Sequence, residues 1–188
     1  MTYYDTLDSP LGSILLTSDG QALTGLYLSE HKHGEEVRPG WLHNDNTPPF
    51  ADVKAQLAAY FSGTLVDFDL PLAPAGTTFQ QSVWRELLSI PYGETVSYGK
   101  LAGRLGNPGA SRAVGLANGR NPISIIVPCH RVIGADGKLT GYGGGLPRKA
   151  ALLAFEKAVL LHGPGAFSYP VPETSDLPDV QLALDFSS

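Results

Sequence analysis

The amino-acid sequence predicts an α+β fold of two domains: a small N-terminal β-sheet with one helix, then a mainly helical, winged-helix-like domain with a helix-turn-helix. Short apolar segments separated by turn residues fill the first 30 positions, whereas helical periodicity dominates after residue 78. A stretch with two prolines and a glycine separates these patterns. A chain of 188 residues can form two small domains. We place them at residues 1–70 and 78–162, with a linker at residues 71–77.

The first domain begins with strands. Residues 12–17 and 22–28 are apolar, and a Ser-Asp-Gly turn signal at residues 18–20 separates them, which is typical of a β-meander. Residues 31–49 are rich in His, Gly, Asn and Pro. We interpret the His-Lys-His run at residues 31–33 as exposed loop in preference to a metal site, and we expect no bound metal.

Helical periodicity begins at residue 50. The apolar positions of residues 50–62 recur at the spacing of an amphipathic helix, and Gly63 is placed to end it. After the linker, Thr78 is placed to cap a second helix, which Pro91 and Gly93 end. One helix therefore belongs to the first domain and the next opens the second.

Residues 97–119 have the outline of a helix-turn-helix. Ser97 can cap a short helix, an Asn-Pro-Gly sequence at residues 107–109 makes a tight turn, and a second helix follows from residue 110 to about 118. Helical spacing places Arg112 on one face of this second helix and four small apolar side chains on another: Ala110, Ala113, Val114 and Ala117. Small residues around one arginine would let the helix approach nucleic acid closely. A plain helical hairpin packed through its glycines is the alternative.

Charge is unevenly distributed along the chain. The net charge of −5 by itself argues against a nucleic-acid partner. Residues 76–163, however, carry ten Lys and Arg against four Asp and Glu, whereas residues 1–75 carry three against ten. Because binding follows the local potential, the basic middle segment can contact phosphate. An ordinary solvated basic face is the alternative.

The chain has one cysteine and no recognisable targeting segment. No apolar run approaches the roughly 18 residues of a membrane span, so we expect a cytoplasmic protein. Cys129 can form neither an internal disulfide nor a paired-thiolate zinc site, and a lone cysteine is more often a buried hydrophobe than a nucleophile. Its surroundings favour reactivity. His130 is a neighbouring base, and Glu156 lies on the apolar stripe of the last helix, where a carboxylate needs a partner.

An ordered set of motifs extends from the helix-turn-helix to the last helix. Its members are Ser111-Arg112-Ala113-Val114-Gly115, Asn121-Pro122, Pro128-Cys129-His130-Arg131-Val132, Tyr142, Gly144-Gly145-Leu146 and Glu156. The set resembles the O6-alkylguanine-DNA alkyltransferases over about residues 78–157. The strand-rich first domain is compatible with the variable first domain of that family.

The resemblance implies direct-reversal DNA repair. The alkyl group of O6-alkylguanine in double-stranded DNA, with O4-alkylthymine as a second candidate substrate, would pass irreversibly to the protein's own cysteine after base flipping. Each monomer would act once, without a cofactor. A non-catalytic alkylated-base-binding protein is the first alternative, but it would lack Cys129. A thiol hydrolase is the second, and it would have no use for a helix-turn-helix.

The resemblance also implies a role for each matching residue. The catalytic residues are Cys129 as alkyl acceptor, His130 as its base through a water molecule, Glu156 as the partner of His130, and Asn121 as the hinge of the active-site segment. DNA binding and base flipping belong to Tyr98, Arg112, Ala113 and Gly115, with Arg112 filling the vacated stack. The guanine pocket is lined by Val132, Tyr142 and Gly143. Because Gly143 replaces a serine of some relatives, only backbone donors remain there.

Residues 163–188 are expected to form a flexible tail, because they contain four prolines and four acidic residues but no Lys or Arg. Within the tail, Gln181, Leu182, Leu184 and Phe186 resemble the short peptide by which bacterial repair proteins bind the DNA sliding clamp. The alternating apolar side chains could enter one groove in an extended conformation. A segment that docks on its own domain, or that stays unstructured, is the alternative.

Overall fold

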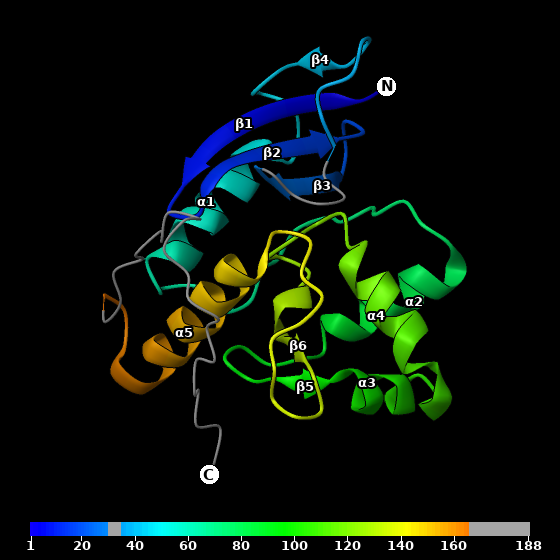
Figure 1. Cartoon of the computed structure of the whole chain (residues 1–188). Helices are drawn as coiled ribbons and strands as arrows, with labels where there is room; N and C mark the ends of the chain where they lie inside the picture. Colours follow the sequence, from blue (N-terminus) through cyan, green and yellow to red (C-terminus); the bar gives the residue numbers. More distant parts are fainter. Residues whose placement is uncertain (30–34, 166–188) are drawn as a thin grey trace.

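The computed structural model describes residues 1–29 and 35–165 (Figure 1). The His-Lys-His run at residues 31–33 and nearly all of the tail lie outside these residues. No helix of the described part is long and apolar enough to cross a membrane. The sequence-based α+β assignment is confirmed, since a small sheet domain precedes a helical one.

The N-terminal sheet has four strands in the order β3-β2-β1-β4. Their bounds are Tyr3–Ser9 for β1, Gly12–Ser18 for β2, Leu23–Leu28 for β3 and Leu42–His43 for β4. Neighbours β1, β2 and β3 pair antiparallel, whereas β4 pairs parallel with β1. The apolar stretches identified β2 and β3 within a residue or two. They did not mark β1, whose alternation is interrupted by the buried Asp5.

Helix α1 (Phe50–Phe61) lies against one face of this sheet (Figure 1). Period-two alternation turns Ile14, Leu16, Leu26 and Leu28 of β2 and β3 toward the core, where each is at most 2% exposed. The buried side chains of α1 are Phe50, Val53, Leu57 and Tyr60. The helical spacing of the apolar residues Phe50, Val53, Leu57, Ala58 and Phe61 predicts one buried stripe, but Ala58 is exposed and Tyr60 is buried.

The helical domain contains four helices and a short parallel strand pair. The bounds are Thr78–Leu87 for α2, Val96–Ser97 for β5, Tyr98–Arg104 for α3, Pro108–Ala110 for the 3-10 turn η1, Ser111–Gly119 for α4, Cys129–Arg131 for η2, Val132–Ile133 for β6 and Leu146–His162 for α5. Strands β5 and β6 pair at the centre of the domain, between α5 and the α2–α4 group (Figure 1).

Local side-chain hydrogen bonds set the starts of two helices. Thr77, one residue before the predicted cap, accepts a hydrogen bond from the backbone of Gln80, whose side chain accepts one from the Thr77 amide in return. This capping box satisfies two backbone amides that a helix start leaves free. Ser97 caps α3 as expected, by accepting from the amide of Lys100.

Helix α4 buries part of its small apolar face. Its buried residues are Val114, Ala117 and Asn118, while Ala113 is exposed beside Arg112. The Trp84 ring nitrogen of α2 donates to the Ala117 carbonyl at 2.9 Å, which fixes α4 against α2. The exposed face of α4 therefore combines an arginine with small and apolar side chains.

Main-chain pairing joins the two halves of the chain. The amide of Leu26 in β3 donates to the Pro122 carbonyl at 2.8 Å, and the amide of Ser124 donates back to Leu26 at 3.1 Å. Leu23 pairs in the same way with residues 71–73, at the start of the segment expected to be a linker. Arg148 of α5 adds side-chain hydrogen bonds to the Leu11 and Ser29 carbonyls. The segment that leads to Cys129 is thus attached directly to the N-terminal sheet.

Candidate active site

Asn121 organises the backbone that carries the cysteine. Its side-chain nitrogen donates to the Val127 carbonyl at 2.8 Å and lies 3.1 Å from the sulfur of Cys129. Its side-chain oxygen accepts from the amide of Ile123 at 3.0 Å. The side chain is buried, so one carboxamide fixes both ends of the segment and touches the thiol. The structure places Asn121, the expected hinge residue, between the two ends of this segment.

The segment between Asn121 and Cys129 is tightly bent. Ile125 has a φ of 71°, an unusual value for a β-branched residue, and the amide of Ile126 donates to the Ser124 carbonyl across it. A conformation of this kind typically costs about 1–3 kcal/mol and persists only where its surroundings impose it. Pro128 forms a second three-residue turn, in which the amide of Cys129 donates to the Val127 carbonyl at 2.8 Å.

Cys129 is buried, with 2% of its surface exposed. Burial raises the pKa of the thiol, although the hydrogen bond from Asn121 and the charge of Lys149 oppose the shift. The resting protein therefore holds a neutral thiol. A base must remove the proton for the sulfur to react as a thiolate.

Glu156 of α5 lies at the centre of a buried hydrogen-bond network. Nε2 of His130 lies 2.8 Å from Oε1, and the Arg131 guanidinium donates to both carboxylate oxygens at 2.9 Å. The Tyr60 hydroxyl and the Gly93 amide also donate, at 2.8 and 3.0 Å. Burial alone would raise the pKa of Glu156, but the interactions with His130 and with the charged Arg131 hold it well below its ordinary range.

His130 is positioned to act as a base. An ionised carboxylate only accepts hydrogen bonds, so Nε2 carries the proton and Nδ1 of the neutral ring is an acceptor. Burial lowers the pKa of His130 despite the opposing charge of Glu156, so the ring is neutral at pH 7. Nδ1 is buried and has no hydrogen-bond partner among the described residues. This nitrogen is free to take a proton.

Three further residues of the site carried no assignment from the sequence. Arg131 and Tyr60 hold Glu156, and Tyr60 reaches it from the N-terminal domain. Lys149 is fully buried, and its ammonium donates to the carbonyls of Val132 and Thr140. Burial lowers the pKa of Lys149 to about 8, against the opposing effect of Cys129. Arg131 belongs to the motif around the cysteine, but no local pattern indicated the buried tyrosine or lysine.

The predicted base-pocket residues lie inside the protein. Val132, Tyr142 and Gly143 are buried, and Gly143 belongs to the loop that follows Thr140. The Tyr98 hydroxyl donates to the Thr140 carbonyl at 2.8 Å, and its ring lies against Gly115 of α4, where an added Cβ would be 3.7 Å away. Tyr98 therefore connects the helix-turn-helix to the loop beside the cysteine.

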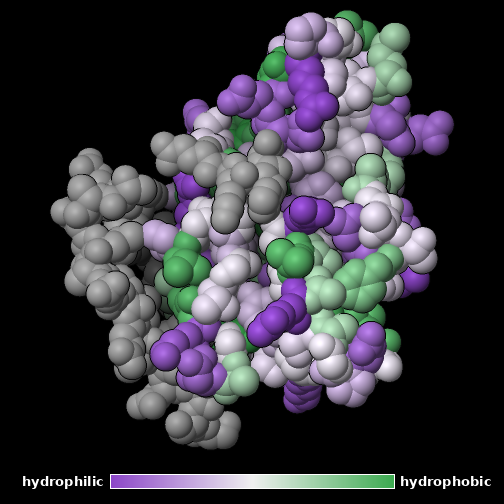
Figure 2. Space-filling view, turned by 45° about the vertical axis from the view of Figure 1, so that its right-hand side comes forward, coloured by the Kyte–Doolittle hydropathy of each residue, from purple (hydrophilic) through white to green (hydrophobic). Residues whose placement is uncertain are grey.

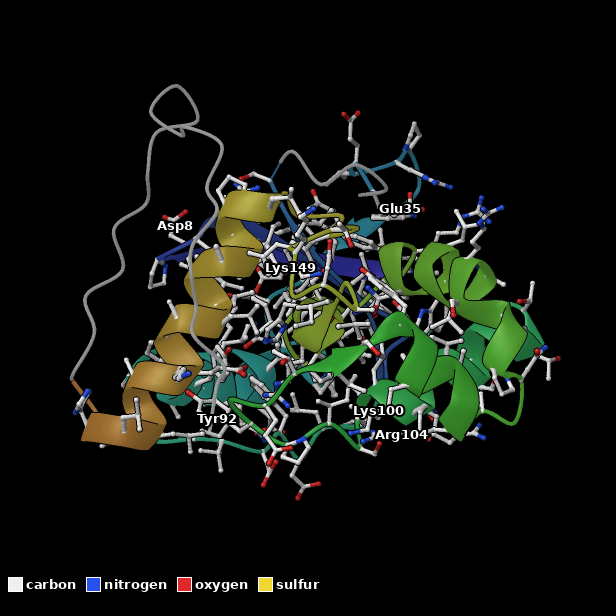
Figure 3. The ribbon with its side chains drawn as sticks, turned by 60° about the horizontal axis from the view of Figure 1, so that its bottom comes forward. Asp8, Glu35, Tyr92, Lys100, Arg104 and Lys149 are labelled. Atoms are coloured by element: carbon white, nitrogen blue, oxygen red, sulfur yellow. The ribbon has the colours of Figure 1, made fainter. Side chains whose placement is uncertain are left out.

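Cationic side chains gather on the exposed side of the helix-turn-helix. Residues 95–135 contain no Asp or Glu, and their exposed cations are Lys100, Arg104, Arg112 and Arg120. Figure 3 shows Lys100 and Arg104 at the edge of the helical domain, apart from the inner Lys149. Leu116 of α4 is 68% exposed among these cations. Hydrophilic and hydrophobic side chains are likewise interspersed on the face in Figure 2, which suits a polyanion with apolar base and sugar edges.

Two further observations concern metal binding and a surface groove. The described residues contain no group of three His, Cys, Asp or Glu side chains that could hold a metal ion. A surface groove of about 410 Å³ lies between α2 and residues 72–74, with Trp84 and Leu88 in its wall, and Cys129 does not line it.

Comparison with known proteins agrees with this geometry. A family model described as "6-O-methylguanine DNA methyltransferase, DNA binding domain" matches residues 78–158, and one described as "6-O-methylguanine DNA methyltransferase, ribonuclease-like domain" matches residues 2–74. The methylated-DNA–protein-cysteine methyltransferase of Mycobacterium tuberculosis H37Rv is 56% identical over 158 residues, which cover 84% of this chain and 94% of the relative. That of Methanosarcina acetivorans is 54% identical over 82% of this chain and 97% of the relative.

Solved structures similar to this chain come from the same family. The crystal structure of Mycobacterium tuberculosis OGT in complex with DNA has a TM-score of 0.77 and 53% identity, over 87% of this chain and 96% of that one. The O6-methylguanine-DNA methyltransferase of Pyrococcus kodakaraensis has a TM-score of 0.56 and 25% identity, over 83% and 99% of the two chains. The chain belongs to the methylated-DNA–protein-cysteine methyltransferases, which act in direct-reversal DNA repair by alkyl transfer.

Proposed function

We propose that Cys129 is the residue that accepts the alkyl group of O6-alkylguanine in double-stranded DNA. The observation that carries this proposal is the burial of the chain's one cysteine against the carboxamide of Asn121, next in the chain to a His130 that is paired with Glu156. The sulfur attacks the alkyl carbon, a carbon–sulfur bond forms, and the bond from that carbon to O6 breaks with its electrons left on the base. The product is a thioether, which no group nearby can cleave, so each molecule reacts once.

His130 takes the thiol proton through one water molecule. Nδ1, the unpartnered nitrogen of the ring, is the acceptor for that water, while Nε2 stays hydrogen-bonded to Glu156. The negative charge of Glu156 stabilises the imidazolium that forms. Because Arg131 shares this carboxylate, His130 stays neutral until the thiol is deprotonated. The positive charge of Lys149 favours the thiolate once it exists.

The helix-turn-helix binds the duplex and brings the alkylated guanine to the cysteine. O6 of a stacked guanine is out of reach of a buried sulfur, so the nucleotide must leave the duplex at a cost of a few kcal/mol. Arg112, exposed on α4, enters the vacated stack and offsets part of this cost. Ala113 and Gly115 keep α4 narrow enough for the minor groove, and Tyr98 contacts the rotated nucleotide. Val132, Tyr142 and Gly143 then enclose the base beside Cys129.

Intact mass and peptide mapping test the assignment. Incubation with DNA that contains O6-methylguanine should add one methyl group per protein molecule, on the peptide with Cys129. Cys129→Ser should still bind alkylated DNA but transfer nothing, since a serine hydroxyl ionises far less readily than a thiol. A methyl group on another residue, or repeated turnover, would exclude the mechanism.

We also propose that the protein acts in the cytoplasm and that its tail binds a protein partner. Gln181, Leu182, Leu184 and Phe186 lie outside the described residues, so the proposal of a sliding-clamp partner rests on their sequence alone. A peptide of residues 176–188 should bind a purified bacterial clamp with roughly micromolar affinity, about −8 kcal/mol. Deletion of residues 180–188 should abolish clamp binding and leave alkyl transfer to short oligonucleotides unchanged. Equal binding by the truncated protein would refute the proposal.

A further inference from the structure

The loop at residues 141–145, which we call the glycine loop, consists of Tyr142 and four glycines. Glycine loses more backbone freedom on ordering than any other residue, so a loop of this composition does not keep one conformation by itself. Gly141 and Gly145 have φ values of 64° and 90°, and the amide of Gly145 donates to the Tyr142 carbonyl at 3.1 Å. Contacts from outside the loop must supply the remaining order.

The helical domain holds the beginning of the glycine loop. The Tyr98 hydroxyl donates at 2.8 Å to the carbonyl of Thr140, the residue before the loop. The side-chain nitrogen of Asn118 lies 3.4 Å from the carbonyl oxygen of Gly141 and 3.3 Å from that of Cys129. An added Cβ at Gly141 would lie 2.8 Å from the Tyr98 hydroxyl oxygen, so the backbone of the loop approaches α3 closely. These contacts fix the first residue of the loop.

Arg148, in the first turn of α5, ties the other end of the loop to the N-terminal domain. Its Nη1 donates to the carbonyls of Gly144 and Ser29, at 3.2 and 2.7 Å. Its Nε donates to the Leu11 carbonyl at 3.0 Å, and its Nη2 donates to the Ser29 hydroxyl at 3.1 Å. An added Cβ at Gly144 would lie 3.0 Å from the side chain of Leu28, so the loop also packs directly against β3.

The planar guanidinium of Arg148 suits this arrangement. Its N–H groups point in fixed directions, so one side chain can join carbonyls from the β1–β2 turn, the end of β3 and the glycine loop. A cation in the first turn of a helix is disfavoured by the helix dipole, so α5 itself gains nothing from an arginine there. The position of Arg148 is therefore explained by what it joins.

We infer that Arg148 is a positioning residue, which makes the N-terminal sheet a support for the glycine loop and thereby for the pocket that receives the alkylated base. The inference rests on the function proposed above, in which Tyr142 and Gly143 line that pocket. Arg148 acts through the backbone of Gly144 and not through contact with the base. The N-terminal sheet accordingly contributes to the reaction, although it supplies none of the reacting atoms.

Free O6-benzylguanine tests the inference, because its reaction needs the pocket but no DNA. Single-turnover transfer rates over a range of its concentrations give a half-saturating concentration and a limiting rate. If the loop of Arg148→Met adopts the pocket conformation about one tenth of the time, the half-saturating concentration rises about tenfold, while the limiting rate stays close to that of the wild type. Amide hydrogen exchange across residues 141–145 should also become faster. Arg148→Lys keeps the charge but not the fork, so it should recover part of the loss.

Lys54→Met is the matched control, since it also replaces a cation that joins two elements. Lys54 of α1 forms an ion pair with the buried Asp5 of β1, within the N-terminal domain. Its loss should lower stability and leave the half-saturating concentration and the limiting rate at their wild-type values.

Several outcomes would overturn the inference. Equal half-saturating concentrations in Arg148→Met and the wild type would exclude a positioning role, and an equal rise in Lys54→Met would trace the effect to general stability. If Arg148→Met does not fold, an unchanged half-saturating concentration in Arg148→Lys still contradicts the inference. Absence of any transfer by the wild-type protein would instead refute the proposed function, so the two failures are distinguishable.

Discussion

Removal of one hydroxyl group from the N-terminal domain should destabilise the whole protein. Tyr60 is fully buried, and its hydroxyl donates to Oε1 of Glu156 at 2.8 Å, across 96 positions of the sequence. Tyr60→Phe keeps the ring and its contacts with Tyr92 and Phe155, whose ring centroids lie 5.9 and 5.6 Å away. The substitution therefore removes a donor from a buried carboxylate and little else.

The expected loss of stability follows from the negative charge of Glu156, which accepts the hydrogen bond. A hydrogen bond to a charged group contributes about 1.5–3 kcal/mol to stability, more than a bond between neutral groups. The free energy of unfolding should fall by that amount. Urea unfolding followed by tryptophan fluorescence measures it as a lower midpoint with an unchanged slope. The rate of alkyl transfer should stay close to that of the wild type, because His130 and Arg131 still hold Glu156.

A matched control separates this bond from the general effect of losing a hydroxyl. Tyr4 of β1 is partly exposed, with its ring 5.3 Å from that of His43 in β4. Tyr4→Phe should change stability by no more than about 0.5 kcal/mol, as is usual for surface substitutions. If Tyr60→Phe is as stable as Tyr4→Phe, the carboxylate does not depend on this donor. The proposed link between the domains would then be refuted.

Three further outcomes are expected. Arg112→Ala should lose repair of duplex DNA but much less reaction with free O6-benzylguanine, which needs no extrusion; equal losses would assign Arg112 to the fold. The pKa values of His130 and Glu156 in the folded protein lie below the ordinary 6.5 and 4.5. As the pH falls below each ordinary value, the unfolded chain therefore binds more protons than the folded protein. Unfolding free energy should therefore fall below pH 6.5, and again below 4.5, in a urea-denaturation series; a constant value would contradict the assignment. Thr77→Ala should cost about 0.5–2 kcal/mol by the same assay, while Thr78→Ala should cost little.

Local patterns predicted most of the fold. Strands β2 and β3, helix α1 and the helix-turn-helix all follow from period-two or helical spacing together with turn and capping residues. The errors arise where tertiary contacts decide between similar local choices. Thr77 caps α2 in place of Thr78 because Gln80 is placed to return the hydrogen bond. The hydrogen bond from Trp84 to Ala117 sets the rotation of α4, which local spacing leaves open.

The motif around the cysteine located the reactive residues but not their supports. Family resemblance grouped Asn121, His130 and Glu156 with Cys129. In the structure the side chain of Asn121 lies 3.1 Å from the sulfur, and that of His130 lies 2.8 Å from Glu156. Tyr60 lies 96 positions from Glu156, and no local spacing indicates that pair. Asn118 resembles any polar residue near a helix end until its two carbonyl partners are known. Long-range polar contacts therefore had to come from the structure.

The arrangement of the site keeps the cysteine unreactive until a flipped nucleobase is bound. A thiol that reacts once cannot be replaced, so an exposed thiolate would be lost to any electrophile or oxidant. Burial raises the pKa of Cys129, and Arg131 shares the Glu156 charge that would otherwise favour a protonated His130. Reactivity then depends on a substrate that brings its alkyl carbon to the sulfur. Side chains of α3 and α4 contact the loop and the backbone beside that sulfur, so the DNA-binding helices and the thiol are joined by direct hydrogen bonds.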